Sequence, residues 1–197
     1  MARHLKANKV LFLGDKDSSL ISWLKKNGES VLNTTEEITK EYILSNQIDL
    51  IVSYGYHHIL RKDILDLLPN KSINLHISFL PWNRGADPNF WSFVDQTPKG
   101  VSIHFLDEGI DTGDIIAQKE LKFDLNDETL ASTYEKLHKS IKELFIENWH
   151  DIKNETCLRI KQVGPGSVHK LQDKKSISYL LKEGWNTPVK VLSKNIL

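Results

Sequence analysis

The stretch that organises this chain reads Ile73-Asn74-Leu75-His76-Ile77-Ser78-Phe79-Leu80-Pro81. Its apolar residues predict a strand that is buried on both faces of a parallel sheet. Asn74 and His76 interrupt the apolar run two residues apart, and because strand side chains alternate between faces, both point to the same side. Pro81 ends the strand, since proline has no backbone N–H to donate. An amide and an imidazole therefore emerge together where open α/β sheets place their ligands, which indicates a catalytic pair. The alternative is that each is an ordinary buried polar group with its hydrogen bonds satisfied.

Strands and helices alternate on both sides of this stretch. Strands are expected at residues 10–14, 31–32, 49–53, 101–105 and 115–121, and helices at about 18–27, 35–44, 62–68 and 128–150. Another helix begins after Asp87, the expected cap, with Pro88 in its first position. This order predicts an α/β protein with a doubly wound, mostly parallel sheet.

Composition narrows the class of protein. The chain of 197 residues has 26 Lys plus Arg and 26 Asp plus Glu, so no overall field attracts nucleic acid or an anionic membrane. The single Cys157 rules out an internal disulfide and fits a cytoplasmic location. We find no signal peptide and no apolar run of membrane length. One cysteine and scattered histidines lack the ligand spacing of a zinc site, so we expect no metal.

The chain changes character at Gly164-Pro165-Gly166, which reads as a flexible joint. We therefore expect a catalytic domain at 1–162 and a C-terminal appendage at 163–197. The appendage is too short to bury a core of its own, so it must pack on the main body or on a second subunit.

Four ordered elements resemble those of the formyltransferase family: Asn74-x-His76, Pro81-x-x-Arg84-Gly85, Gly100-x-x-x-His104 and Asp111-x-Gly113. The resemblance implies a Rossmann-like formyltransferase fold and an enzyme that moves a formyl group from N10-formyltetrahydrofolate to an amine. It also implies a catalytic trio of Asn74, His76 and Asp111. The residues implied for folate binding are Tyr56, His57, His58, Ile59, Leu60, Leu106, Asp107 and Gly109.

The acceptor loop implied by the resemblance contributes Arg84, Gly85, Asn89 and Trp91. Arginine offers a charged fork for phosphate, and an indole can stack on a ring. The alternative is that Trp91 is a core residue of the helix.

Three acceptors occur in the family. Glycinamide ribonucleotide formyltransferases begin with a glycine/serine phosphate loop, where this chain has Gly14-Asp15-Lys16-Asp17, and methionyl-tRNA formyltransferases carry a sizeable further domain. Residues 81–91, His169 and residues 184–188 are most similar to sugar-nucleotide N-formyltransferases. We therefore expect an amino-deoxysugar on a nucleoside diphosphate, dTDP in the first place, as acceptor for surface polysaccharide (lipopolysaccharide O-antigen) synthesis. Such enzymes are generally dimers, so we favour a homodimer joined by the appendage.

The chemistry of the trio agrees with this reaction. The Asn74 amide suits a developing oxyanion, and His76, with an ordinary pKa of about 6.5, can accept the amine proton or donate one. Asp111 can orient and stabilise the charged imidazole. Two alternatives remain: a nucleotide-binding module without activity, and a metal-dependent hydrolase with His57, His58, His76 and Asp111 as ligands.

Overall fold

The computed structural model describes residues 8–193, so the outer ends of both predicted regions, 1–7 and 194–197, lie outside the described residues. The strands are β1 (Lys9–Gly14), β2 (Ser30–Thr34), β3 (Leu50–Tyr54), β4 (Ser72–His76), β5 (Arg84–Gly85), β6 (Gly100–Phe105), β7 (Ile115–Glu120) and β8 (Val168–His169). The helices are α1 (Ser19–Lys26), α2 (Lys40–Asn46), α3 (Lys62–Leu65), α4 (Pro88–Val94), α5 (Leu130–Lys153) and α6 (Val189–Leu192), with 3-10 helices η1 (Asp173–Leu180) and η2 (Gly184–Asn186).

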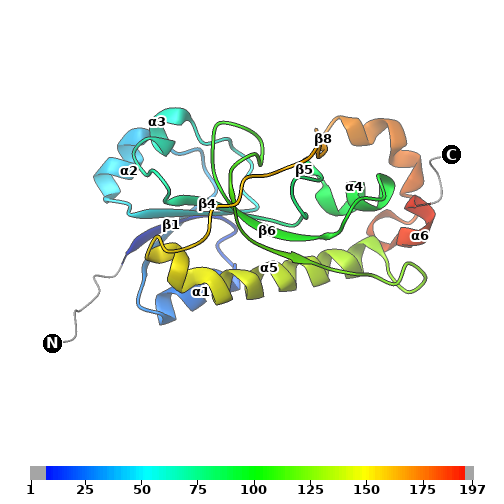
Figure 1. Cartoon of the computed structure of the whole chain (residues 1–197), viewed down its shortest axis with the longest axis horizontal. Helices are drawn as coiled ribbons and strands as arrows, with labels where there is room; N and C mark the ends of the chain where they lie inside the picture. Colours follow the sequence, from blue (N-terminus) through cyan, green and yellow to red (C-terminus); the bar gives the residue numbers. More distant parts are fainter. Residues whose placement is uncertain (1–7, 194–197) are drawn as a thin grey trace.

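The main sheet has the strand order β2-β1-β3-β4-β6-β7. The first four of these strands are parallel, whereas β6 runs antiparallel to both of its neighbours, β4 and β7. The predicted doubly wound, mostly parallel sheet is confirmed. Figure 1 shows α2 and α3 above this sheet and α1 and α5 below it.

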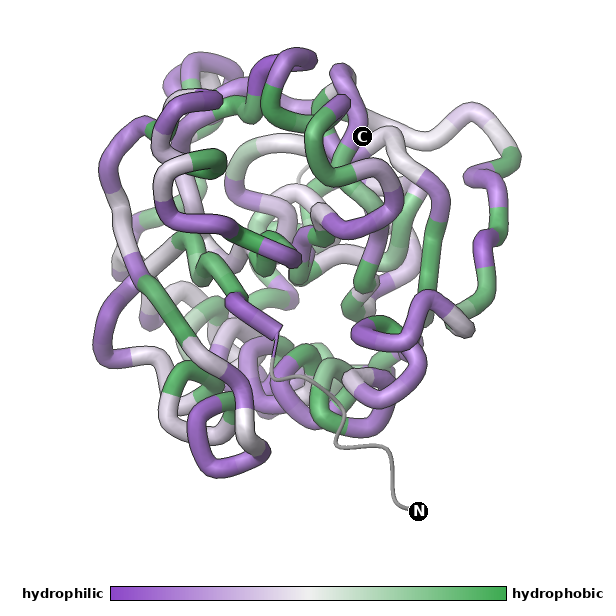
Figure 2. The backbone as a smooth tube through the Cα atoms, turned by 90° about the vertical axis from the view of Figure 1, so that its left-hand side faces the viewer, coloured by the Kyte–Doolittle hydropathy of each residue, from purple (hydrophilic) through white to green (hydrophobic). Residues whose placement is uncertain are grey.

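Two apolar clusters fix these layers. Below the sheet, α1 and α5 pack on residues such as Val52, Leu75 and Ile103. Above it, α2 and α3 cover residues of β1 and β3, such as Leu13 and Ile51. Figure 2 shows hydrophilic residues along much of the outer loops, as expected for a chain with its apolar residues inside. Among the described residues, no helix is long and apolar enough to cross a membrane.

Local sequence explains where the helices begin. Helix α2 starts five residues later than expected at 35, because Thr39 caps it by accepting the Tyr42 N–H at 3.2 Å. Helix α5 begins with a reciprocal pair, in which Thr129 and Ser132 each accept the other's backbone N–H. Asp87 does precede α4, but its carboxylate pairs with Lys174 Nζ at 3.0 Å instead of capping the helix.

The C-terminal region packs on its own chain. Leu180, Val189 and Leu192 are buried in a third apolar cluster with α4 residues such as Phe90. Strand β8 pairs in parallel with β5, so residues 168–169 form a separate two-stranded sheet with a strand of the main body. Other apolar side chains of this region, such as Trp185, are exposed. The division at 162 and the role of residues 163–197 in a homodimer stay predictions.

Candidate active site

The upper face of the sheet changes character at β4 and β6. The apolar residues of β4, Ile73 and Leu75, face the α5 side, which turns Asn74 and His76 to the upper side. The antiparallel register places Asn74 opposite His104 and His76 opposite Ser102. Four polar side chains thus form one patch beside the apolar cluster that lies beneath α2 and α3, and this patch is the floor of the candidate site.

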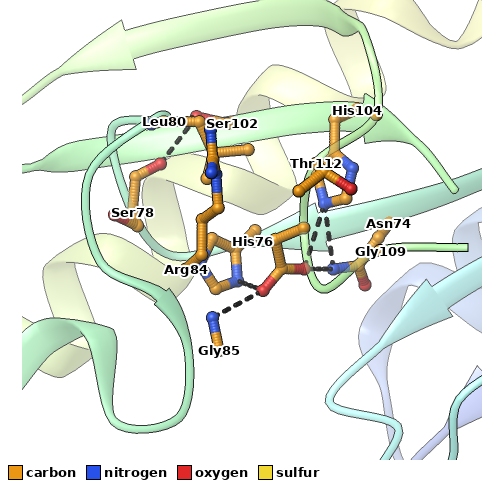
Figure 3. Close-up of polar contacts among 12 residues, drawn as sticks. Asn74, His76, Ser78, Leu80, Arg84, Gly85, Ser102, His104, Gly109 and Thr112 are labelled. Carbon is orange, nitrogen blue, oxygen red and sulfur yellow. Dashed lines mark hydrogen bonds and ion pairs between the residues drawn. The ribbon is translucent and has the colours of Figure 1, made fainter. Parts of the chain in front are cut away.

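The carboxylate of Asp111 is the hub of the patch. Its Oδ1 accepts the amide of Asn74 at 3.1 Å and lies 3.3 Å from Nε2 of His104. Its Oδ2 accepts the backbone N–H of Gly85 at 2.8 Å and lies 3.7 Å from Nδ1 of His76. In Figure 3 the side chains of Asn74, His76 and His104 converge from neighbouring strands. The structure therefore brings the predicted trio together in one contact network.

His104 was quoted in the family motif but was not predicted as a site residue. Its ring is 1% exposed, Nδ1 lies 2.8 Å from the carbonyl of Phe105, and Nε2 lies 3.2 Å from the amide of Asn74. The signal was available in the sequence, because Ser102 and His104 repeat on β6 the i, i+2 polar pattern of Asn74 and His76.

His76 has one nitrogen that is fixed and one that titrates. Nε2 lies 3.1 Å from the carbonyl oxygen of Asn83, which can only accept, so we assign the hydrogen to Nε2. Nδ1 therefore gains or loses the proton, and it faces Asp111. Burial lowers the pKa of His76 below its ordinary value, and the Asp111 carboxylate offsets part of this shift by raising it.

The charge state of Asp111 follows from its surroundings. Burial raises the pKa of the Asp111 carboxyl, but His76, His104 and the Gly85 N–H outweigh burial and hold the pKa below its usual range. At neutral pH the site thus contains a carboxylate beside a neutral imidazole that is ready to accept a proton.

Residues after α5 hold the loop that carries Asn83 and Gly85. Ser167 accepts the Asn83 N–H with its hydroxyl at 2.8 Å, and its backbone bonds Arg84 N at 3.0 Å and Pro81 O at 3.2 Å. The N–H of Ala86 then donates to His169 O at 2.9 Å. The predicted appendage therefore positions the Asn83 carbonyl that bonds to His76 and the Gly85 N–H that bonds to Asp111. In this way it contributes to the site.

The predicted acceptor residues fall into two groups. Gly85 contacts Asp111, and Arg84 is half-buried with Nε and Nη2 donating to Gln162 at 3.1 and 2.9 Å. Asn89 is 2% exposed, and its amide donates to Leu130 O at 3.0 Å. Trp91 is 7% exposed and stacks on His169 with ring centroids 3.9 Å apart. Asn89 and Trp91 therefore join α4 to α5 and to β8 in this structure, and neither bonds to Asp111.

Four of the eight predicted folate residues line two different cavities. Leu106 and Asp107 line one of about 290 Å³ between α3 and the loop after β6. Tyr56 and His57 line another of about 560 Å³, at the carboxyl ends of β1, β2 and β3. The rest vary in burial: His58, Ile59 and Gly109 are exposed, while Leu60 is buried in the cluster under α2 and α3.

The 290 Å³ cavity contains a polar group that sequence analysis missed. Ser72 is 3% exposed and lines this cavity, and its hydroxyl has no hydrogen-bond partner among residues 8–193. The cavity is lined by the apolar Leu65, Leu68 and Leu106 and by polar side chains such as Asp107, so it fits a ligand with apolar faces and a polar edge.

The ligand set for the metal-hydrolase alternative is not assembled. Within the described part of the chain, no group of three or more His, Cys, Asp or Glu side chains is arranged to hold a metal ion. His57 and His58 are exposed, whereas His76 is buried.

Known proteins are similar to this chain in fold and in sequence. Residues 15–148, more than half of the chain, match the family described as Formyl transferase. The protein therefore belongs to the formyl transferase family, which confirms the resemblance in its sequence.

Within that family, the chain is similar to the formyltransferase PseJ from Anoxybacillus kamchatkensis. The two share 44% identity and a TM-score of 0.90, over 95% of this chain and 100% of that one. The PseJ structure is a complex with UDP-4,6-dideoxy-4-formamido-L-AltNAc and tetrahydrofolate. A 4-N formyltransferase from Francisella tularensis shares the fold, with 23% identity and a TM-score of 0.74 over 94% of this chain and 86% of that one.

The chain also matches part of the sequence of methionyl-tRNA formyltransferases. A methionyl-tRNA formyltransferase from Desulforamulus reducens is 35% identical over 130 residues, which are 66% of this chain. The match spans only 38% of that protein, well under two thirds of its length.

Proposed function

We propose that the protein transfers a formyl group from N10-formyltetrahydrofolate to the amine of an amino-deoxysugar linked to a nucleoside diphosphate. The observation that carries this proposal is the similarity to PseJ, which extends at 44% identity over 95% of the chain and covers the whole of that protein. The Asp111 hub supports it, because an amide, an imidazole and a carboxylate meet on one face of the sheet.

The residues of the hub suit attack by an amine on a formyl carbon. The neutral imidazole of His76 accepts at Nδ1 the proton that the amine releases, and returns it to N10 as the bond between N10 and the formyl carbon breaks and tetrahydrofolate leaves. Asp111 Oδ2, at 3.7 Å, then compensates the charge of the imidazolium. Asn74 Nδ2 has two hydrogens: one is held by Asp111, and the other, directed at His104 in the free protein, is available to the oxygen that develops negative charge.

The cavity lined by Ser72, Leu106 and Asp107 is the candidate binding site for the ring of the folate. Apolar leucines would contact the faces of a flat ring, and polar side chains of the lining, such as Asp107, would face its polar edge. Bound N10-formyltetrahydrofolate would supply the electrophilic formyl group.

The acceptor that we favour is a UDP-linked 4-amino-4,6-dideoxy-N-acetyl-altrosamine. The ligand in the PseJ structure is the 4-formamido form of this sugar on UDP, so removing the formyl group gives the amine substrate. This replaces dTDP, which sequence analysis favoured, as the first nucleotide to test. Arg84 is the candidate ligand for the diphosphate, since its Nη1 has no partner among the described residues.

The experiment is an assay of the full chain with N10-formyltetrahydrofolate and a panel of UDP- and dTDP-linked amino sugars. Formation of the formamido product from the UDP-4-amino sugar, resistant to chelator, is the expected result. Turnover of glycinamide ribonucleotide or methionyl-tRNA in its place would refute the acceptor. Folate binding with no turnover of any amine would support the nucleotide-binding alternative. A role in surface polysaccharide synthesis, a cytoplasmic location, a homodimer and the lack of nucleic-acid or membrane partners remain predictions.

A further inference from the structure

Gln162 joins two parts of the site that lie far apart in the sequence. Its Nε2 donates to the carbonyl oxygens of Asp111 and Gly113, both at 2.8 Å. Its Oε1 accepts Nε and Nη2 of Arg84 at 3.1 and 2.9 Å. A primary amide has two hydrogens and an oxygen with two lone pairs, so this side chain uses its full hydrogen-bonding capacity on these contacts.

The backbone of Gln162 is itself anchored to the sheet. Ile160 and Ile115 exchange backbone hydrogen bonds of 2.9 and 2.8 Å, which attaches the segment after α5 to the edge strand β7. Figure 1 shows this segment crossing over the sheet on its way to β8. The amide therefore projects from a fixed point onto the loop between β6 and β7.

That loop needs such an anchor. Residues 107–110 are exposed, and Asp107 makes only local bonds, to Gly109 N at 3.1 Å and Thr112 Oγ1 at 2.7 Å. Asp111 adopts the left-handed region with φ of 52°. Among the described residues, no other group donates to the carbonyls of Asp111 and Gly113. Without Gln162 both carbonyls lose their partner, and the loop gains freedom to move the carboxylate.

We propose that Gln162 is a positioning residue, which fixes the Asp111 carboxylate and the Arg84 guanidinium relative to each other and so aligns the amine acceptor with the hub. The expected effects on kcat and KM rest on the proposed function, whereas the expected effect on the position of Asp111 does not. A displacement of about 1 Å in a reacting group costs about 10²-fold in rate. The side chain therefore acts on catalysis through Asp111 and on acceptor binding through Arg84.

Two variants of the full chain separate these effects. Gln162→Glu keeps an oxygen for Arg84 but has no hydrogen to donate to the Asp111 and Gly113 carbonyls. Gln162→Leu has similar size and removes both sets of bonds. We expect both variants to lose about 10²-fold in kcat with little change in the KM for the folate, and only Gln162→Leu to raise the KM for the sugar nucleotide as well.

Gln118→Leu is the matched control. Gln118 is also half-buried, and its Nε2 donates to Leu80 O at 2.8 Å and to Ser102 Oγ at 2.9 Å. It should lower the thermal stability by a similar amount and keep kcat close to that of the wild type, because its bonds do not reach Asp111.

Hydrogen exchange gives a readout that does not depend on activity. The N–H of Gly85 donates to the Asp111 carboxylate, so its exchange rate reports whether that carboxylate stays in place. We expect exchange at Gly85 and across 106–114 to rise at least tenfold in Gln162→Leu and to stay unchanged in Gln118→Leu. Equal exchange in the two variants, or a normal kcat in Gln162→Leu, would overturn the proposal. A wild type that formylates no amine would refute the proposed function, while the exchange data would still decide whether Gln162 holds Asp111.

Discussion

The carboxylate of Asp111 accepts the backbone N–H of Gly85 at 2.8 Å, which joins the loop after β6 to the short strand that begins with Arg84. The same carboxylate lies 3.7 Å from His76, so the group beside the imidazole also joins the loop that carries Gly85 to the sheet. In the proposed reaction, Asp111 would link catalysis to acceptor binding, and substitutions around it should have distinguishable effects.

Asp111→Asn should lower kcat by at least about 10²-fold, because an amide cannot compensate the charge on His76. The fold should be retained, since the new side-chain oxygen can still accept the Gly85 N–H. Steady-state kinetics measure the effect. Asp114→Asn is the control. Asp114 lies in the same loop as Asp111 but pairs with Arg159 at 3.2 Å, so this substitution should leave kcat unchanged. Similar losses in the two variants would argue that the loop responds to any lost charge.

The contribution of Asp111 to the stability of the protein should decrease as the pH falls below about 4. The folded-state pKa of this carboxyl is held below its unfolded value, which is about 3.9. The unfolded chain therefore binds the proton first as the pH falls. The contribution of Asp111 is complete above the unfolded pKa and is lost progressively as the pH falls toward the lower folded-state pKa. Urea unfolding from pH 3 to 7 should show a gap between wild type and Asp111→Asn that narrows below about pH 4. A gap that stays constant to pH 3 would contradict the pKa shift.

His76→Asn should remove the acid limb of the pH–rate profile along with most of kcat. Burial places the pKa of His76 below its ordinary 6.5, so the neutral base persists and the limb of wild-type kcat/KM should lie below pH 6.5. The loss in kcat should be about 10²–10⁴-fold. Folate binding, followed by fluorescence, should be nearly normal. A limb that survives in His76→Asn would assign the titration to another group.

The sequence predicted the parts of the fold that depend on local pattern. The alternation of apolar runs located the strands around Val52 and Leu75, and the i, i+2 spacing put Asn74 and His76 on one face. It could not predict the pairing of β5 with β8, because two residues in each strand carry no periodic signal. The role of Gln162 could not be predicted for a related reason. Its partners Arg84 and Asp111 lie 78 and 51 residues away, and a glutamine in a loop belongs to no sequence pattern that indicates such contacts. The family resemblance assigned Asn89 and Trp91 to the acceptor loop, and the structure buries both side chains, so their role in binding an acceptor stays a prediction.

Arg84→Ala should raise the KM for the sugar nucleotide much more than the KM for the folate. The guanidinium is held by Gln162 with Nη1 left for a ligand, and a bond from a charged group contributes about 1.5–3 kcal/mol. Arg84→Lys should recover only part of the affinity, because an ammonium cannot bond Gln162 and a diphosphate in the same fork geometry. Initial rates at varied concentrations of each substrate provide the test. Equal increases in both KM values would place Arg84 in a purely structural role.

Leu192→Ala should destabilise the whole protein, although it lies in the region predicted to be an appendage. Leu192 is 0% exposed and packs in the cluster of α4, so truncation would leave a cavity in a continuous core. Losses of this kind are about 2–5 kcal/mol. Urea unfolding of the full chain should show one cooperative transition at a lower midpoint. Val168→Ala is the control, since that side chain is 55% exposed and should change the free energy of unfolding by less than about 0.5 kcal/mol.

If Leu192→Ala instead left the midpoint unchanged and lowered the mass measured by light scattering, residues 163–197 would serve the contact between subunits, as the sequence suggested. If the midpoint falls while the mass is unchanged, the region belongs to the folding unit that holds Gly85 against Asp111.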